Sequence, residues 1–200
     1  MFKNRADAGR KLAKQLKAGK RTVVLGLPRG GVVTAAEVAK ALKVPLDIIV
    51  TKKLGYPRDP EYGIGAVGLK TDVIDRAGVD PAYIKREIAQ LRKQVKERYQ
   101  NLRGKRKMPA LAGKMVIIVD DGMATGASME AAVKEVATQK PAKVIVAVPV
   151  AHPDAVRRIE RIAEVICLEQ PWRFLAVGEF YEDFREVTEE DVKKFLKKPL

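Results

Sequence analysis

Five short and mostly apolar segments constrain the fold of this chain more than any other feature of its sequence. They span residues 22–26, 45–50, 114–119, 143–148 and 163–167. Segments with helical spacing of apolar residues lie between most of them, at residues 32–42, 127–138 and 153–162. A strand that is apolar on both faces is typical of a parallel sheet covered on both sides by helices. The sequence therefore predicts an α/β fold with a mostly parallel sheet flanked by helices.

Three further segments lie outside this alternation. Residues 7–18 show the apolar spacing of a helix. Residues 52–61 are rich in glycine and proline and are expected to form a loop. Residues 64–69 and 73–74 are expected to pair as a small hairpin.

A long basic helix and an aromatic C-terminal part interrupt the order of strands and helices. Asp80 is a suitable N-cap before Pro81, and a helix inserted at about residues 80–102 is expected. Its apolar residues form one stripe, so we expect it to be dispensable for binding a small molecule; they are Ile84, Ile88, Leu91, Val95, Tyr99 and Leu102. Residues 168–200, with a helix that begins at Thr188, are expected to form a small cap on a single domain over residues 1–200.

The net charge of +14 is concentrated in two segments. Residues 1–21 contain eight Lys and Arg against one Asp, and residues 85–107 contain ten against two Glu, so their net charges are +7 and +8. Such segments suit partners that bear phosphate, and a solvated surface is the simpler explanation. The chain has no nucleic-acid motif and no aromatic residues interleaved with the basic ones, so nucleic-acid binding is the less favoured interpretation.

The single cysteine and the single histidine exclude several classes of site. Cys167 cannot form an internal disulfide or a multi-cysteine zinc site, and we expect it in the core. His152 precedes Pro153 at the start of a helix and is expected to be structural. No apolar stretch is long enough to span a bilayer, and the N-terminus lacks the apolar run of a secretory signal. We therefore expect a cytoplasmic protein without membrane contact.

The most informative motif is V-I-I-V-D-D-G-M-A-T-G-A-S at residues 116–128, where a strand passes into a helix. Asp120 and Asp121 are adjacent at the end of the strand, and their repulsion is unfavourable unless a cation or a hydroxyl-rich ligand lies between them. The glycines and the helix N-terminus suit an anion, and Thr125 and Ser128 add hydroxyl donors. The motif therefore predicts a sugar-phosphate site, with the phosphate on the loop and the hydroxyls on the acids.

This motif resembles the ribose-phosphate-binding signature of the type I phosphoribosyltransferases. The segments G-L-P-R-G-G at residues 26–31, T-K-K-L-G at 51–55 and Y-E-D-F-R-E-V at 181–187 resemble one uncharacterised branch of that family. The resemblance thus covers nearly the whole chain. It implies that phosphoribosyl diphosphate or a nucleoside 5′-monophosphate binds to Gly122, Met123, Ala124, Thr125, Gly126, Ala127 and Ser128.

The resemblance also assigns the loop after the first strand to the pyrophosphate group. Pro28, Gly30 and Gly31 would wrap the pyrophosphate, with the glycine N–H groups as donors. Arg29 would contact it through the two-pronged guanidinium. In the family this loop often carries a cis peptide bond that does not precede proline.

Two lysines and the acid pair complete the implied site. Lys52 or Lys53 would neutralise the leaving pyrophosphate, and we expect unequal roles because adjacent side chains of an extended segment point in opposite directions. Asp120 and Asp121 would hold ribose hydroxyls or the waters of Mg²⁺, the implied cofactor. The implied reaction is displacement of pyrophosphate from phosphoribosyl diphosphate by a nucleobase or an amine, with Arg29 and a lysine stabilising the departing charge.

The sequence leaves the acceptor open. In family members that act on 6-oxopurines, an aspartate that contacts the base commonly precedes the Thr-Gly of the loop, whereas this chain has Ala124. Hypoxanthine and guanine are therefore disfavoured, and adenine, uracil and a non-nucleobase amine remain. Trp172 and Phe174 are expected either to stack on a base or to fill the core of the cap.

Two other functions remain compatible with the sequence. A regulatory protein could use the same pocket to sense phosphoribosyl diphosphate or a nucleotide, and its basic segments could bind RNA. A hydrolase could release ribose phosphate without any acceptor. The oligomeric state, including a homodimer, is also left open.

Overall fold

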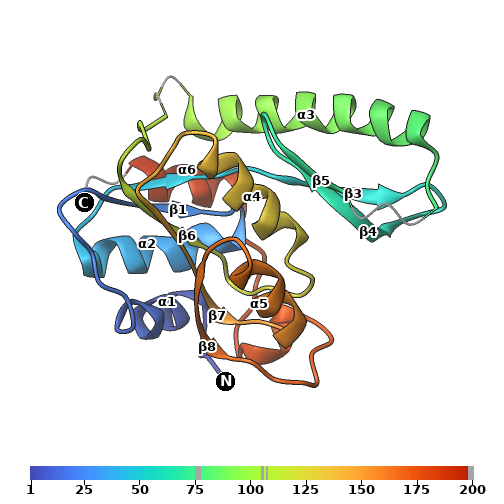
Figure 1. Ribbon diagram of the computed structural model, residues 1–200. Helices are drawn as coiled ribbons and strands as arrows, with labels where there is room; N and C mark the ends of the chain where they lie inside the picture. The colour runs from blue at the N-terminus through green and yellow to red at the C-terminus, as the bar shows by residue number, and fades with distance from the viewer. Residues whose placement is uncertain (75–77, 105, 107, 198–200) are drawn as a thin grey trace.

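Five parallel strands form the central sheet of the protein, in the order β2-β1-β6-β7-β8 (Figure 1). The computed structural model describes residues 1–74, 78–104, 106 and 108–197, so Lys105, Lys107 and the last three residues of the expected cap lie outside it. The five strands are β1 (Thr22–Gly26), β2 (Leu46–Ile48), β6 (Met115–Val119), β7 (Lys143–Val150) and β8 (Glu164–Glu169). Every pairing among them is parallel, which confirms the predicted sheet.

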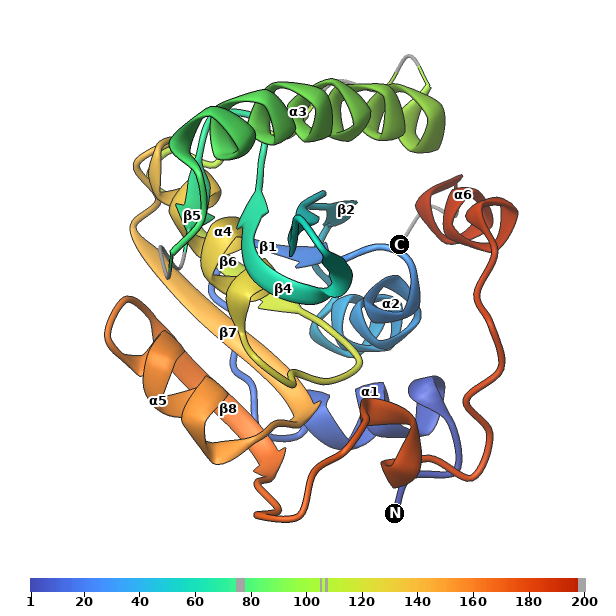
Figure 2. The same ribbon diagram turned by 90° about the vertical axis from the view of Figure 1, so that its right-hand side faces the viewer.

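Helices cover both faces of this sheet, as its apolar strands predict (Figure 2). Along β6, Val116 and Ile118 are buried on one face and Ile117 and Val119 on the other. The first face packs against α4 (Ala127–Ala137), α5 (Pro153–Glu160) and the C-terminal part of α3 (Pro81–Arg103). The second face packs against α1 (Arg5–Ala13) and α2 (Gly30–Leu42).

The expectation of a loop at residues 52–61 is wrong, because a second sheet begins there. β3 (Lys52–Tyr56) pairs antiparallel with β4 (Asp59–Val67), and β4 pairs with β5 (Asp72–Ile74). The β3–β4 register shifts on both sides of Gly55, so the glycine marks an irregularity within a strand. The expected hairpin is therefore only the outer part of a longer three-stranded sheet.

The first helix, α1, also differs from its expected bounds. It spans Arg5–Ala13 rather than residues 7–18. Asn4 is the N-cap, and its side-chain oxygen accepts a hydrogen bond of 2.9 Å from the Asp7 N–H. Leu16 lies beyond the helix but is still buried, because the turn after Ala13 continues over the same core. Apolar spacing therefore extended the expected helix too far.

The long helix α3 begins at the expected N-cap, where Asp80 accepts a hydrogen bond of 2.9 Å from the Ala82 N–H. Only the C-terminal part of its apolar stripe is buried, whereas Ile84 and Ile88 line a cavity of about 500 Å³ beside β5. Over the described residues, neither α3 nor any other helix is both long and apolar enough to cross a membrane.

Two buried polar contacts hold the C-terminal end of α3 to the central sheet. The Val50 N–H donates to the Tyr99 hydroxyl at 2.9 Å. The Arg103 guanidinium lies 2.7 Å from the Asp47 carboxylate, and these side chains are only 4% and 8% exposed. Burial raises the pKa of Asp47, although the N–H of Ile48 and the charge of Arg103 oppose the shift.

The segment after β8 contacts two separate parts of the body. It first forms a short 3-10 helix, Val177–Phe180, and packs the Tyr181 ring against Phe2 near the N-terminus. It then runs to α6 (Glu189–Lys197), which contacts both α2 and α3 (Figure 2). The helix expected after Thr188 is confirmed, and the Thr188 hydroxyl accepts a hydrogen bond of 3.2 Å from the Asp191 N–H.

Replacing Arg103 by Met should lower the free energy of unfolding by about 3–5 kcal/mol at pH 7, because the Asp47 carboxylate would stay buried without its cation. Burial already raises the pKa of Asp47, so protonation at pH 4 should reduce the loss. Urea unfolding at both pH values measures this difference. Lys96→Met on the exposed side of the same helix is the control, and an equal loss in both variants would contradict the assignment.

Candidate active site

The two loops singled out by the sequence lie side by side at the carboxyl edge of the central sheet. Gly26 at the end of β1 pairs with Val119 at the end of β6. The Leu27 N–H donates to the Val119 carbonyl at 3.0 Å, just before the acid pair. The loop at residues 27–29 and the loop at residues 120–126 therefore form one site.

Asp120 is half-buried against the start of α2. One of its carboxylate oxygens accepts a hydrogen bond of 2.8 Å from the Asp121 N–H. A Cβ on Gly31 would lie 2.5 Å from the Asp120 carboxylate, so only glycine allows this approach. Burial and then the charge of Asp121 raise the pKa of Asp120 well above its usual range. The ionised form of Asp120 is therefore unfavourable in the free protein.

Asp121 has a cation of its own. The Arg5 Nε lies 2.6 Å from its carboxylate, and the two side chains are 11% and 14% exposed. A Cβ on Gly30 would overlap that carboxylate and approach the Arg5 side chain. The two acids thus differ: Asp121 belongs to an ion pair, and Asp120 bears the cost of burial.

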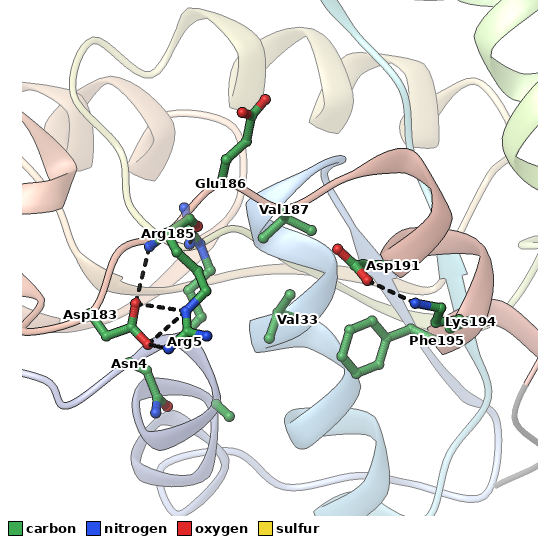
Figure 3. A pocket seen from close by; sticks show the side chains of 11 residues that line it. Asn4, Arg5, Val33, Asp183, Arg185, Glu186, Val187, Asp191, Lys194 and Phe195 are labelled. Carbon is green, nitrogen blue, oxygen red and sulfur yellow. Dashed lines mark hydrogen bonds and ion pairs between the residues drawn. The ribbon is translucent and has the colours of Figure 1, made fainter.

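Arg5 was missed by the sequence analysis. Its guanidinium lies 3.7 Å from the centre of the Phe184 ring and donates to the Arg185 carbonyl at 2.8 Å. It also lines a cavity of about 580 Å³ between α1, α2 and α6, where Val33 and Phe195 form the apolar side (Figure 3). Eight basic residues occur in residues 1–21, and nothing in the sequence distinguishes this one.

Tyr181 fixes the backbone of the same acid. Its hydroxyl donates to the Asp121 carbonyl at 2.5 Å, and its ring packs 5.0 Å from that of Phe184. Burial and then the charge of Asp121 raise the pKa of Tyr181, so the phenol remains a donor. Residues from both ends of the chain therefore hold Asp121 in place.

Part of the predicted phosphate loop serves the fold itself. The Met123 side chain is buried in the core, its N–H donates to the Val150 carbonyl at 3.0 Å, and its carbonyl accepts from the His152 N–H at 2.9 Å. Ala127 is buried against β4 and β5. A Cβ on Gly122 would overlap Val177. These residues shape the loop, and the side chain of Met123 packs in the core.

The loop is exposed to solvent at Ala124 and Thr125, just before the start of α4. Ala124 and Thr125 are exposed and line a cavity of about 650 Å³ together with arginines of α5. Gly126 has φ +78°, a conformation that favours glycine, and α4 begins without a side-chain hydrogen bond at its N-cap. Ser128 is half-buried in the first turn. The N–H groups and the positive end of the helix dipole at this loop suit an anion.

The other loop contains the cis peptide bond expected from the family, between Pro28 and Arg29. The Arg29 guanidinium is 2.7 Å from the Glu186 carboxylate. Pro28, Arg29 and Lys52 line a cavity of about 690 Å³. Lys53 lies on the other side of β3, where its stem packs against Gly63. Of the two candidate lysines, it is Lys52 that faces the same space as Arg29.

Polar residues of α3 line the cavity that contains Arg29 and Lys52, so the expectation that this helix is dispensable for binding a small molecule stays a prediction to be tested there. The residues of α3 and α6 that line this cavity are Gln94, Glu97, Arg98, Asn101 and Glu189. The stripe that packs on the core leaves the neighbouring face of the helix directed at this cavity. The amphipathic spacing of α3 predicts which face of the helix is buried. It does not predict which residues lie opposite the neighbouring polar face.

Four other residues considered in the sequence lie outside both loops. His152 caps α5, where its Nδ1 accepts a hydrogen bond of 3.1 Å from the Asp154 N–H, so its structural role is confirmed. Cys167 is half-buried against the core, and burial raises its pKa to about 11. Phe174 packs 5.1 Å from Phe180, whereas Trp172 is 75% exposed.

Among the described residues, no three His, Cys, Asp or Glu side chains gather to hold a metal ion. Two carboxylates are present, and Arg5 already occupies one oxygen of Asp121. Mg²⁺ prefers octahedral oxygen coordination and keeps several waters, so it fits here only if a substrate brings further oxygen ligands.

The chain is similar to a known family and to known proteins. A family model described as the phosphoribosyl transferase domain matches residues 2–183. A Mycobacterium tuberculosis protein, provisionally named a phosphoribosyl transferase, is 42% identical over 209 aligned positions. That match covers 98% of this chain but 46% of the relative, so the chain spans less than half of the relative's length.

Several solved structures resemble this protein, and two of them illustrate the range of similarity. A protein of Thermus thermophilus is 46% identical, with a TM-score of 0.84 over 98% of this chain and 97% of that one. A purine phosphoribosyltransferase of Pyrococcus horikoshii is 19% identical, with a TM-score of 0.54 over 94% of this chain and 97% of that one, and so shares the fold. The family model covers residues 2–183, from the N-terminal segment that contains Arg5 to the aromatic segment that contains Tyr181. Because this is most of the chain, the protein belongs to the phosphoribosyl transferase family.

Proposed function

We propose that the protein transfers a phosphoribosyl group from phosphoribosyl diphosphate to a nucleobase or an amine and releases pyrophosphate. The observation that carries this proposal is the meeting of two loops of opposite character at one sheet edge. One loop presents the acids Asp120 and Asp121, and the other presents Arg29 next to Lys52. Hydroxyls and a multiply charged anion on one small molecule would match this arrangement.

The acid loop would bind the ribose 5′-phosphate part of the substrate. Backbone N–H groups of residues 124–128 and the N-terminus of α4 suit the phosphate, and the hydroxyls of Thr125 and Ser128 add donors. Asp120 would accept hydrogen bonds from ribose hydroxyls. Asp121, which Arg5 holds in place, would be the second acceptor. A hydroxyl donor beside Asp120 would stabilise its ionised form, which burial makes unfavourable.

Arg29 and Lys52 would act on the leaving group. Charge grows on pyrophosphate as its bond to the sugar breaks, so fixed cations at that point stabilise the transition state more than the ground state. When bound with the substrate, Mg²⁺ would neutralise part of the pyrophosphate charge, and Asp120 and Asp121 would hold its waters. Gly30 and Gly31 allow the close approach to the acids, and Pro28 lines the same cavity as Arg29.

The first prediction of the proposed function concerns turnover. With phosphoribosyl diphosphate and Mg²⁺, pyrophosphate release should depend on the presence of an acceptor, because the site holds the sugar and the leaving group together. A coupled pyrophosphate assay across adenine, uracil, 6-oxopurines and simple amines measures it. Release of ribose phosphate without any acceptor would indicate a hydrolase. Tight binding without turnover would indicate a sensor, and either result contradicts the proposal.

The second prediction separates the two acids. Asp120→Asn should abolish turnover and leave the free protein as stable or more stable. Since burial raises the pKa of Asp120, its ionisation costs stability as pH rises above the usual carboxyl range, so the gain should be larger at pH 7 than at pH 4. Asp121→Asn should instead lower stability by about 1–3 kcal/mol, because Arg5 loses its carboxylate.

Thermal and urea unfolding of both variants, with the turnover assay, test this second prediction. Asp154→Asn in the exposed first turn of α5 is a control for removing one carboxylate. Equal destabilisation by Asp120→Asn and Asp121→Asn would mean that both acids are structural, and the assignment to ribose would be wrong.

The third prediction concerns the leaving group. Arg29→Ala should slow turnover by about a hundred- to a thousandfold, the loss of about 2.7–4 kcal/mol seen when one such donor is removed. Binding of a nucleoside 5′-monophosphate should hardly change, because that ligand leaves the loop empty. Lys52→Ala should also slow turnover, and Lys53→Ala is the matched control from the opposite side of β3. A large loss of monophosphate affinity in Arg29→Ala would place the 5′-phosphate on that loop.

A further inference from the structure

A third cation faces the cavity that contains Arg29 and Lys52. Arg98 of α3 lines it from the opposite wall, with a side chain that is 22% exposed. The three basic residues come from three different elements: the loop after β1, the start of β3 and the C-terminal half of α3. Two acids, Glu97 and Glu189, also line the cavity, and Gln94 and Asn101 add amide groups.

The approach of Arg98 to Arg29 is electrostatically unfavourable in the free protein. Burial lowers the pKa of Arg98, the charge of Glu189 raises it, and the charge of Arg29 lowers it further. Packing does not require this arrangement, because the residues that anchor α3 to the core lie on its neighbouring face, at Val95, Tyr99 and Leu102. Two guanidinium groups that share one polar cavity are instead typical of a site for a multiply charged anion.

Carboxylates of the C-terminal segment partly neutralise these cations. Glu186 lies 2.7 Å from Arg29, and Glu189 lies 3.8 Å from Arg98 and accepts a hydrogen bond of 2.5 Å from the Asn101 amide. In Figure 3 the side chain of Glu186 extends away from the side chains of Arg5 and Asp183. The Glu186 side chain is 73% exposed, so solvent reaches it easily and little holds it against Arg29.

We propose that Arg98 is a third contact for the pyrophosphate group of the substrate, and that Glu186 and Glu189 give up their cations to that group when it binds. The inference rests on the proposed function and adds α3 and the C-terminal segment to its site. A cavity of about 690 Å³ is within the size range of ligand sites. Pyrophosphate carries more charge than two separate carboxylates and offers oxygens in the geometry that guanidinium forks bind.

A purely structural role for Arg98 makes a different prediction. If Arg98 served only to tie α3 to α6 through Glu189, loss of either partner would break the same contact. Arg98→Gln and Glu189→Gln would then act in the same direction, on stability, and ligand affinity would not separate them. If Glu189 competes with pyrophosphate, the two substitutions act on affinity in opposite directions.

The test is calorimetric titration of the full chain with inorganic pyrophosphate, with phosphoribosyl diphosphate and with a nucleoside 5′-monophosphate, each with Mg²⁺. Arg98→Gln should weaken binding of pyrophosphate and of phosphoribosyl diphosphate by about ten- to a hundredfold, the usual effect of losing a hydrogen bond between charged groups. Affinity for the monophosphate should stay the same. Glu189→Gln should strengthen pyrophosphate binding by about two- to fivefold.

Lys93→Gln is the matched control, because it removes one charge from the same helix at a side chain that is 80% exposed. Unchanged pyrophosphate affinity in Arg98→Gln, or an equal loss in Lys93→Gln, would overturn the inference. If Arg98→Gln fails to fold, the titration of Glu189→Gln tests the inference instead. Weaker pyrophosphate binding in Glu189→Gln would then overturn the inference. No binding of phosphoribosyl diphosphate by the unmodified protein would overturn the proposed function itself, which is a distinguishable result.

Discussion

The site depends on the close contact between the start of α2 and the acid pair at the end of β6. Gly30 and Gly31 lie so near Asp121 and Asp120 that a single Cβ at either position would collide with a carboxylate. The contact sets the distance between the two loops, because β1 and β6 are adjacent and in register up to their last residues. It also brings Arg29, the residue before these glycines, to the edge of the same site. The two glycines therefore allow the two loops to pack closely against each other.

The ends of the chain complete what the sheet begins. Arg5 from α1 binds the Asp121 carboxylate, and Tyr181 from the segment after β8 binds the Asp121 carbonyl. The C-terminal segment then continues past Arg29 to α6, where Glu189 meets α3. One stretch of chain therefore contacts the acid loop, the arginine loop and the long helix in succession.

The sequence predicted the central sheet and the meeting of the two candidate loops at one edge of it, because both depend on local patterns. Apolar strands with helices between them identify a covered parallel sheet, and parallel strands bring the motif at residues 116–128 to the same edge as the loop before Gly30. Long-range contacts were not predictable. Nothing local marks Arg5 among its basic neighbours, and the strand at Lys52–Tyr56 has a glycine at its register shift, so it had the composition of a loop. The sequence does not show that the face of α3 with Arg98 lies opposite Arg29 and Lys52, because this contact depends on the tertiary fold.

The charges of the site follow one physical logic. Asp120 lies beside Asp121, and Arg98 lies near Arg29, so each half of the site keeps like charges close together. Within each half one member has a partner, since Arg5 binds Asp121 and Glu186 binds Arg29. A ligand that brought only hydroxyls to the acids would reduce the repulsion between the two carboxylates and leave that between the two arginines. An anion bound to the arginines alone would do the reverse. A ribose that carries a pyrophosphate would relieve both at once, and under the proposed function this joint relief would favour a substrate whose sugar and leaving group are still bonded.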